Sequence, residues 1–133
     1  MCLMKLKKKV RQLEKRENIP LVRFGLKEER VYFNHATLTV LGNPKYVQFL
    51  YVEDRKLLLV AGNNEKLPSS LTVPHEVYQY HTRELRICHK HLTEAFILRL
   101  GWDKNENYIV TGAFNPHVGM VVFELERAAK TES

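Results

Sequence analysis

The stretch VYFNHATLTVLG, residues 31–42, changes within one short segment from the pattern of a β-strand to that of a helix. The β-branched and aromatic side chains at its start favour a strand. Asn34 belongs to the residue types that cap helix N-termini, and Gly42 stands where a helix commonly ends in a left-handed residue. A similar switch recurs in RICHKHLTEAFILRLG, residues 86–101, which also ends in a glycine. The repetition predicts two copies of one strand-to-helix unit.

The flanking segments extend each switch into a larger unit. In the first copy, LVRFGLKEERVYFN predicts a hairpin that turns at Lys27–Glu29, and YVQFLYV and KLLLVAG predict a second hairpin after the helix. In the second copy, EVYQY and LRICH predict the first hairpin, LTEAFILRL a longer helix, and YIVTGAF and MVVFEL the last hairpin. The buried face of the longer helix is predicted by a repeat every four residues, at Leu92, Phe96 and Leu100.

These units predict an α+β, β-rich fold. A chain of 133 residues with 44% hydrophobic residues can bury one ordinary core, whereas each copy is too small to bury its own sheet. We therefore expect two pseudo-symmetric hairpin–helix–hairpin repeats packed as one barrel-like domain behind a basic N-terminal helix. The predicted boundaries are 1–18 for the N-terminal helix, 21–62 and 76–127 for the repeats, 63–75 for the connection and 128–133 for a tail.

The composition indicates in which cellular compartment the protein is found. The sequence has no run of 18 apolar residues, so we expect no membrane span, and the N-terminal lysines are not followed by the continuous apolar segment of a signal peptide. The two cysteines, Cys2 and Cys88, make no CxxC spacing, which suits reduced thiols. These observations predict a cytoplasmic protein.

The net charge of +6 is concentrated at one end of the chain. Residues 1–30 hold ten Lys or Arg and four Glu, whereas residues 31–133 hold eleven basic and eleven acidic side chains. Within the first segment, a 3-4-3 spacing of Leu3, Leu6, Val10 and Leu13 predicts an amphipathic helix. Three roles stay open for it: contact with phosphates, dimerisation, or packing of its apolar stripe on the core.

The sequence nominates no catalytic residue and no cofactor. It holds no glycine-rich phosphate loop and neither a Gly-x-Ser-x-Gly nor an HExxH motif. His89 and His91 would share one face if the strand continued that far, but a zinc site needs further ligands that the spacing does not supply. We therefore expect a non-enzyme without a bound metal.

The aromatic residues can either stack on nucleic-acid bases or fill the core. Alternation along strands favours the core for most of them. Trp102 directly follows a glycine that ends a helix and is the best candidate for a ring at a partner surface. The other rings weighed are Tyr46, Phe49, Tyr51, Tyr78, Tyr80, Tyr108 and Phe114.

The first copy, residues 29–62, resembles the swapped-hairpin DNA-binding domains of the AbrB, SpoVT, MazE and MraZ group. Phe33-Asn34 stands where that group has Ile-Pro at the end of a strand, Leu41-Gly42 matches its helix stop, and residues 53–56 match its charged turn. Two copies in one chain are similar to MraZ. The resemblance implies DNA contact by Arg30, whereas the helix carries Thr37, Thr39 and Val40 in place of the group's arginines.

Two function hypotheses follow. The first is a DNA-binding transcriptional regulator of AbrB/MraZ-like type, with basic side chains on phosphates. The second is a non-enzymatic protein-interaction module, such as a mobile-element or phage-type inhibitor or adaptor. Homo-oligomerisation is compatible with both. The candidate nucleic-acid-binding residues are Lys5, Lys7, Lys8, Lys9, Arg11, Lys15, Arg16, Arg23 and Arg30.

Overall fold

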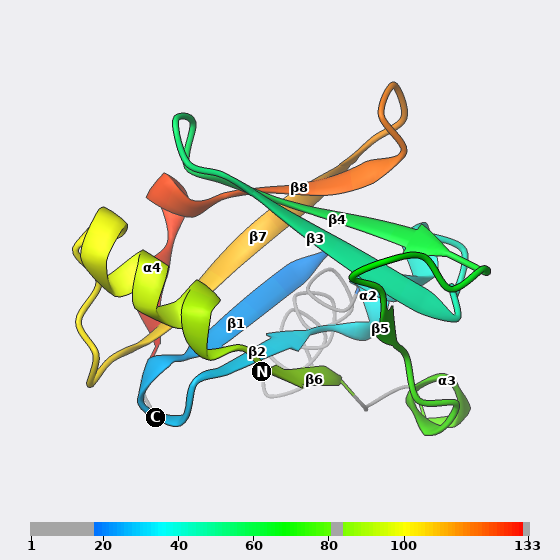
Figure 1. The fold of residues 1–133 in the computed structure, drawn as a ribbon, viewed down its shortest axis with the longest axis horizontal. Helices are drawn as coiled ribbons and strands as arrows, with labels where there is room; N and C mark the ends of the chain where they lie inside the picture. Colours follow the sequence, from blue (N-terminus) through cyan, green and yellow to red (C-terminus); the bar gives the residue numbers. More distant parts are fainter. Residues whose placement is uncertain (1–17, 81–83, 132–133) are drawn as a thin grey trace, which may run out of the picture.

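The computed structural model describes residues 18–80 and 84–131 of the chain. Within these ranges, antiparallel strands form one sheet in the order β5-β3-β4-β8-β7-β1-β2-β6, with β9 also paired to β7. The sheet curls into an open half-barrel around the core (Figure 1). The strands are β1 Leu21–Gly25, β2 Arg30–Phe33, β3 Tyr46–Val52, β4 Leu57–Asn63, β5 Leu71–Thr72, β6 Leu85–Cys88, β7 Asn107–Asn115, β8 Met120–Glu124 and β9 Ala129–Thr131.

The first half of the chain follows the predicted order of elements. β1 and β2 form a hairpin whose turn places Glu29 in the left-handed region, at φ 58°. Asn34 then caps α2 (His35–Val40), because its side-chain oxygen accepts a hydrogen bond from the backbone N–H of Thr37. The chain leaves the helix through Gly42 at φ 85° and continues into the β3–β4 hairpin. The strand-to-helix switch predicted from residues 31–42 is confirmed.

The second half departs from the prediction at its start. EVYQY was expected as a strand, but Glu76–Gln79 form the short helix α3, preceded by Pro74. Val77 and Tyr78 donate backbone hydrogen bonds to the carbonyls of Pro74 and His75, so the segment closes into turns and offers no strand edge to β6. The second unit therefore begins with a helix, and β6 pairs with β2 instead of forming a hairpin with EVYQY.

The remainder of the second half agrees with the prediction more closely. The helix α4 (Lys90–Leu100) ends at Gly101, whose φ is 67°, and the β7–β8 hairpin follows it. Phe96 is fully buried, and Leu92 and Leu100 pack partly buried against the core. The predicted connection contains β5, which pairs with β3, and the predicted tail contains β9, which pairs with β7.

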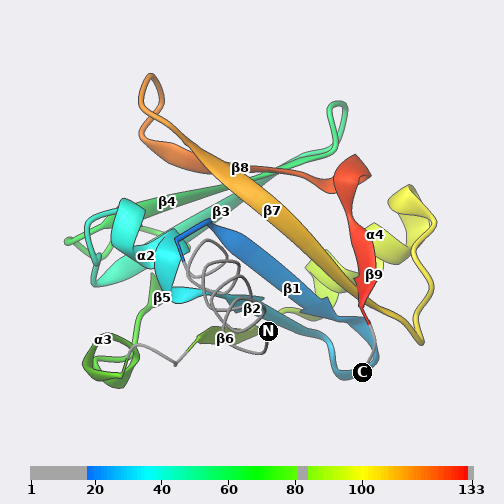
Figure 2. The ribbon, with the colours of Figure 1, turned by 180° about the vertical axis from the view of Figure 1, so that it is seen from behind.

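The core lies between two layers of the curled sheet. In Figures 1 and 2, the strands β3, β4 and β8 lie on one side of the molecule and β1, β2 and β6 on the other, with α2 and α4 at opposite ends. The largest fully buried side chains come from both layers and from α4, and they include Phe24, Phe33, Phe96 and Phe123. Each layer therefore turns one face to the core and the other face away from it.

Trp102 contributes to the core, and the prediction that it lies at a partner surface is wrong. Only 9% of its surface is exposed, and its ring stacks on Tyr108 with centroids 4.4 Å apart. It also contacts Phe24 and Phe96, with centroid distances of 5.2 and 5.3 Å. The reason is local, because the left-handed Gly101 ends α4 and allows the chain to carry the indole inwards.

The predicted class of an antiparallel, β-rich α+β fold is confirmed. The predicted basic helix at 1–18 lies outside the described residues, apart from Asn18. Across the two described ranges, none of the helices has the length and apolar character required to cross a bilayer.

Candidate nucleic-acid interface

The candidate phosphate-binding residues divide into two groups. Arg23 on β1 and Arg30 on β2 lie within the described residues. The others lie outside them, in the segment that leads directly into β1: Lys5, Lys7, Lys8, Lys9, Arg11, Lys15 and Arg16.

The outer face of β1, β2 and β6 brings three arginines together. Arg23 lies opposite Tyr32 across β1 and β2, and Tyr32 lies opposite Arg86 across β2 and β6. In the next row, Arg30 lies opposite Cys88. Directly opposed residues in antiparallel strands project to the same side of a sheet, so these five side chains share one surface. We call this surface, made of Arg23, Arg30, Tyr32, Arg86 and Cys88, the arginine face.

Arg23 is held in place by two contacts on this face. Its guanidinium lies over the Tyr32 ring, 4.0 Å from the centroid. Its Nη2 atom lies 3.0 Å from Oε1 of Glu84, and both side chains of this ion pair are about one-third exposed. Glu84 therefore offsets part of the positive charge of Arg23 while fixing its orientation.

Among the described residues, Arg30 and Arg86 have no carboxylate partner of the kind that Glu84 provides for Arg23. Hydrogen bonds with the side chains of Tyr32 and Cys88 raise the pKa of Arg30. No carboxylate among the described residues forms an ion pair with it. Arg86 is exposed, and it makes no ion pair with any residue that the structure describes. Sequence reasoning missed Arg86 because its place beside Tyr32 depends on the pairing of β2 with β6, two strands more than 50 residues apart in the chain.

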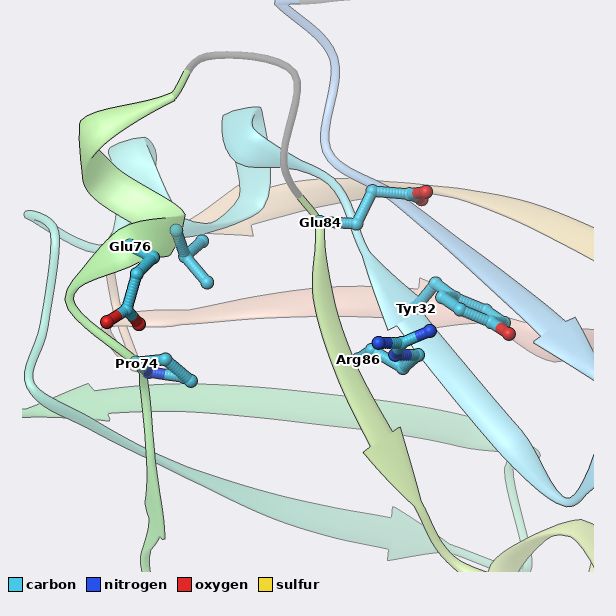
Figure 3. Close-up of a pocket in the computed structure, with 6 residues that line it drawn as sticks. Tyr32, Pro74, Glu76, Glu84 and Arg86 are labelled. Carbon is cyan, nitrogen blue, oxygen red and sulfur yellow. The ribbon is translucent and has the colours of Figure 1, made fainter.

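A hollow of about 480 Å³ opens beside the arginine face. Figure 3 shows Arg86 next to Tyr32, with Pro74 and Glu76 on the facing segment and Glu84 above them. Because Glu76 and Glu84 line the same hollow, a phosphate there would meet carboxylates as well as the guanidinium. An anion is therefore better placed on the side of Arg86 that faces Arg30 than inside the hollow, which Arg30 does not line.

The histidines next to this face do not share a strand. β6 ends at Cys88, so the strand does not continue far enough for His89 and His91 to share one of its faces. His89 caps α4, with its Nδ1 accepting a hydrogen bond from the backbone N–H of Leu92 at 3.1 Å, and His91 is exposed in the first turn of that helix. Within residues 18–80 and 84–131, no three His, Cys, Asp or Glu side chains are grouped so as to hold a metal.

The opposite layer has a different outer face. On β3, β4, β8 and β7, the residues that alternate with the buried ones are almost all uncharged, and Leu50 is 55% exposed. A shallow hollow of about 190 Å³ lies on this side, next to Leu50, Leu59 and Met120. We call this surface the apolar face; it consists of Gln48, Leu50, Val52, Leu57, Leu59, Ala61, Ala113, Met120 and Val122.

The charge of the described residues is almost balanced. Residues 18–80 and 84–131 hold thirteen Lys or Arg and twelve Asp or Glu. Any long-range attraction to a polyanion therefore comes mainly from the basic residues that precede β1, and the arginine face adds a local, oriented contribution.

Comparisons with protein-family models, with curated proteins and with solved structures found no match to this chain.

Proposed function

We propose that this chain is a non-enzymatic, cytoplasmic DNA-binding transcriptional regulator of AbrB/MraZ-like type. The observation that carries the proposal is the arginine face, where arginines from three strands project to the same outer side of the sheet. Arginine is well suited to phosphate contacts because its planar group offers several donors in a fixed geometry. The seven basic residues at positions 5–16 precede this face in the chain and add the charge that the body lacks.

In this proposal the arginine face positions the protein on the sugar-phosphate backbone. Arg30 and Arg86 make the phosphate contacts, while Arg23, held by Tyr32 and Glu84, sets the geometry beside them. Phosphate contacts fix register and orientation without themselves reading the sequence. Affinity should therefore fall steeply with salt.

We further propose that the two halves are related by a pseudo-twofold axis. Two pairings support this relation: β4 with β8, the last strands of the two units, and β2 with β6, the strands that precede α2 and α4. In both units a helix closed by a left-handed glycine leads into a hairpin, β3–β4 or β7–β8. The two units differ at their start, where the second has the helix α3 in place of the strand β1, and the proposed axis relates the elements that follow.

The test is DNA binding by fluorescence anisotropy across salt concentrations, with a random-sequence duplex as the probe. Arg30→Ala and Arg86→Ala should each weaken binding and make the log-log salt slope shallower by about one unit for each phosphate that is no longer neutralised. Arg55→Ala is the matched control, because it removes the same charge from the β3–β4 turn, away from the arginine face. Equal effects of all three substitutions would contradict a role for this face and would indicate a generic charge effect.

The apolar face favours a second candidate function, a protein-interaction module. Contiguous exposed apolar surface on a small domain commonly marks a site of protein association. A protein that bound no DNA at low salt but bound a protein partner in a manner sensitive to Leu50 would support this second function over the first.

A further inference from the structure

A row of apolar side chains crosses four strands on the apolar face. Leu50 lies opposite Leu59 across β3 and β4, and Leu59 lies opposite Val122 across β4 and β8. Ala113 on β7 completes the row opposite Val122. Neighbouring rows add Val52 with Leu57 and Ala61 with Met120. The centre of this sheet face therefore presents hydrocarbon to its surroundings.

Most of the charges near one end of this face are paired within the chain, and Asp54 and Arg55, at the β3–β4 tip, are opposite in sign. Glu53 lies 2.8 Å from Arg99, and Lys56 lies 3.4 Å from Glu126. Glu124, at the edge of the face on β8, lies 2.8 Å from Arg127. A strongly charged partner, such as a polyanion or an anionic lipid surface, would gain little here. A neutral apolar surface is the better match in charge.

The shape of the face is that of a saddle. Figures 1 and 2 show the tips of the β3–β4 and β7–β8 hairpins rising at opposite ends of the layer, on the side away from the core. Across the strands, the same layer curves the other way, because the sheet curls around the core. A saddle fits a second, identical saddle after a quarter turn, and sheets do pack face to face with their strands nearly perpendicular.

We propose that two copies of the chain associate through their apolar faces, with the strands of one layer crossing those of the other. In this arrangement the raised hairpin tips of each copy flank the edges of its partner, which gives a role to Val118, 54% exposed in the β7–β8 tip. The contact is isologous, as in most homodimers. The two arginine faces remain uncovered, because each lies on the opposite side of its half-barrel.

The size of the face predicts a reversible dimer. Four strands about 4.8 Å apart, each contributing about five residues, give roughly 300 Å² of flat area per copy before the hairpin tips are added. Two such faces give about 600 Å² in total before the tips are counted, which is below the roughly 1,000 Å² expected of a stable specific complex, so the contact is a weak and transient one. We therefore expect a dimer that dissociates on dilution through the micromolar range.

Sedimentation velocity of the full chain at increasing concentration tests the proposal, with Leu50→Lys as the interface variant. Leu98→Lys is the matched control, because Leu98 is 80% exposed on α4 and lies outside the apolar face. We expect the wild type and Leu98→Lys to dimerise alike, and Leu50→Lys to raise the dissociation constant at least tenfold while its circular dichroism spectrum stays that of the wild type.

Three outcomes would overturn the dimer. The first is a wild-type chain that remains monomeric at all concentrations tested. The second is equal weakening by Leu50→Lys and Leu98→Lys. The third is a monomeric full chain that dimerises only when residues 1–18 are deleted, since that result would make the N-terminal segment the occupant of the apolar face. If Leu50→Lys no longer dimerises but still binds DNA with an unchanged salt slope, then the dimer and the proposed DNA contact are independent of each other.

Discussion

Tyr78 is a half-buried residue of α3 whose hydroxyl donates a hydrogen bond to the backbone carbonyl of Pro44. The bond links two segments far apart in the sequence, the short helix before β6 and the turn before β3. Burial raises the pKa of Tyr78 to about 12, because the neutral phenol is favoured over the phenolate away from water. The protonated side chain therefore stabilises the fold more than the ionised one would.

The pH dependence of stability follows from this shift. An unfolded tyrosine has a pKa of about 10, so above that value the unfolded state loses the proton before the folded state does. The contribution of Tyr78 is therefore complete below about pH 10 and is lost as the pH rises towards 12. Urea unfolding between pH 8 and 11.5 should show this decline, reduced in Tyr78→Phe. Ionisation of all tyrosines in one step near pH 10, followed by phenolate absorbance, would contradict the assignment.

Residue-level expectations failed where a side chain's environment depends on distant segments. Trp102 follows a glycine in a way that is typical of an exposed loop, yet its indole is covered by Phe24, Phe96 and Tyr108. Two of these three rings come from β1 and β7, which pair with each other. The position of Trp102 next to a helix end could be predicted from the sequence, whereas its burial could be predicted only by knowing that β1 pairs with β7.

At the scale of elements, the two helix stops are the best-predicted features. Gly42 and Gly101 both have positive φ, as the Leu-Gly pattern predicts. A Cβ added at either glycine would meet nothing within 4 Å, so the cost of a side chain is backbone strain and not a clash. This distinguishes them from Gly112, where a Cβ would come within 2.6 Å of the Phe123 ring.

A prediction for Gly101 separates strain from packing. Gly101→Ala should lower the free energy of unfolding by about 1 kcal/mol, because an L-residue pays a conformational penalty in the left-handed region. Gly101→Asn should lose less, since asparagine tolerates this region better than alanine does. Urea unfolding of the three proteins checks the order. A loss for asparagine equal to or greater than that for alanine would show that something other than φ determines this position.

Short elements were the ones that sequence patterns could not place. In EVYQY, Val77 is buried and Tyr78 half-buried, and five residues are too few to separate a helical period from a strand period. The strands β5 and β9 have two and three residues and exist because β3 and β7 offer edges to them. Such short strands form because a longer strand offers hydrogen bonds at its edge, so their own residues show little of the alternation that predicts a strand.

At the scale of the whole molecule, the half-barrel turns two unlike faces outwards. The arginine face depends on β6 pairing with β2, and the apolar face depends on β8 pairing with β4. Period-two alternation predicts that each strand has an outer face, but not which strands are neighbours. For this reason the sequence predicted Arg23 and Arg30 as phosphate-binding residues but not Arg86. It likewise predicted the apolar stripe of the N-terminal segment but not the apolar row through Leu59.

The basic N-terminal segment decides how much of any DNA affinity belongs to the folded body. Deleting residues 1–18 removes seven basic and two acidic side chains and leaves a described body that is almost neutral. If the segment binds phosphates, DNA affinity should fall in the deletion variant. The salt slope should also become shallower, by about one unit for each phosphate that the segment neutralises in the full chain.

If Leu3, Leu6, Val10 and Leu13 instead pack on the protein, the deletion should lower the free energy of unfolding or the oligomer size, because less apolar area is then buried. The salt slope of DNA binding would then stay that of the full chain. Anisotropy titrations across salt and urea unfolding of both proteins distinguish the two roles. Undetectable DNA binding by the intact chain at low salt, where phosphate contacts are strongest, would reject the regulator in favour of the protein-interaction module.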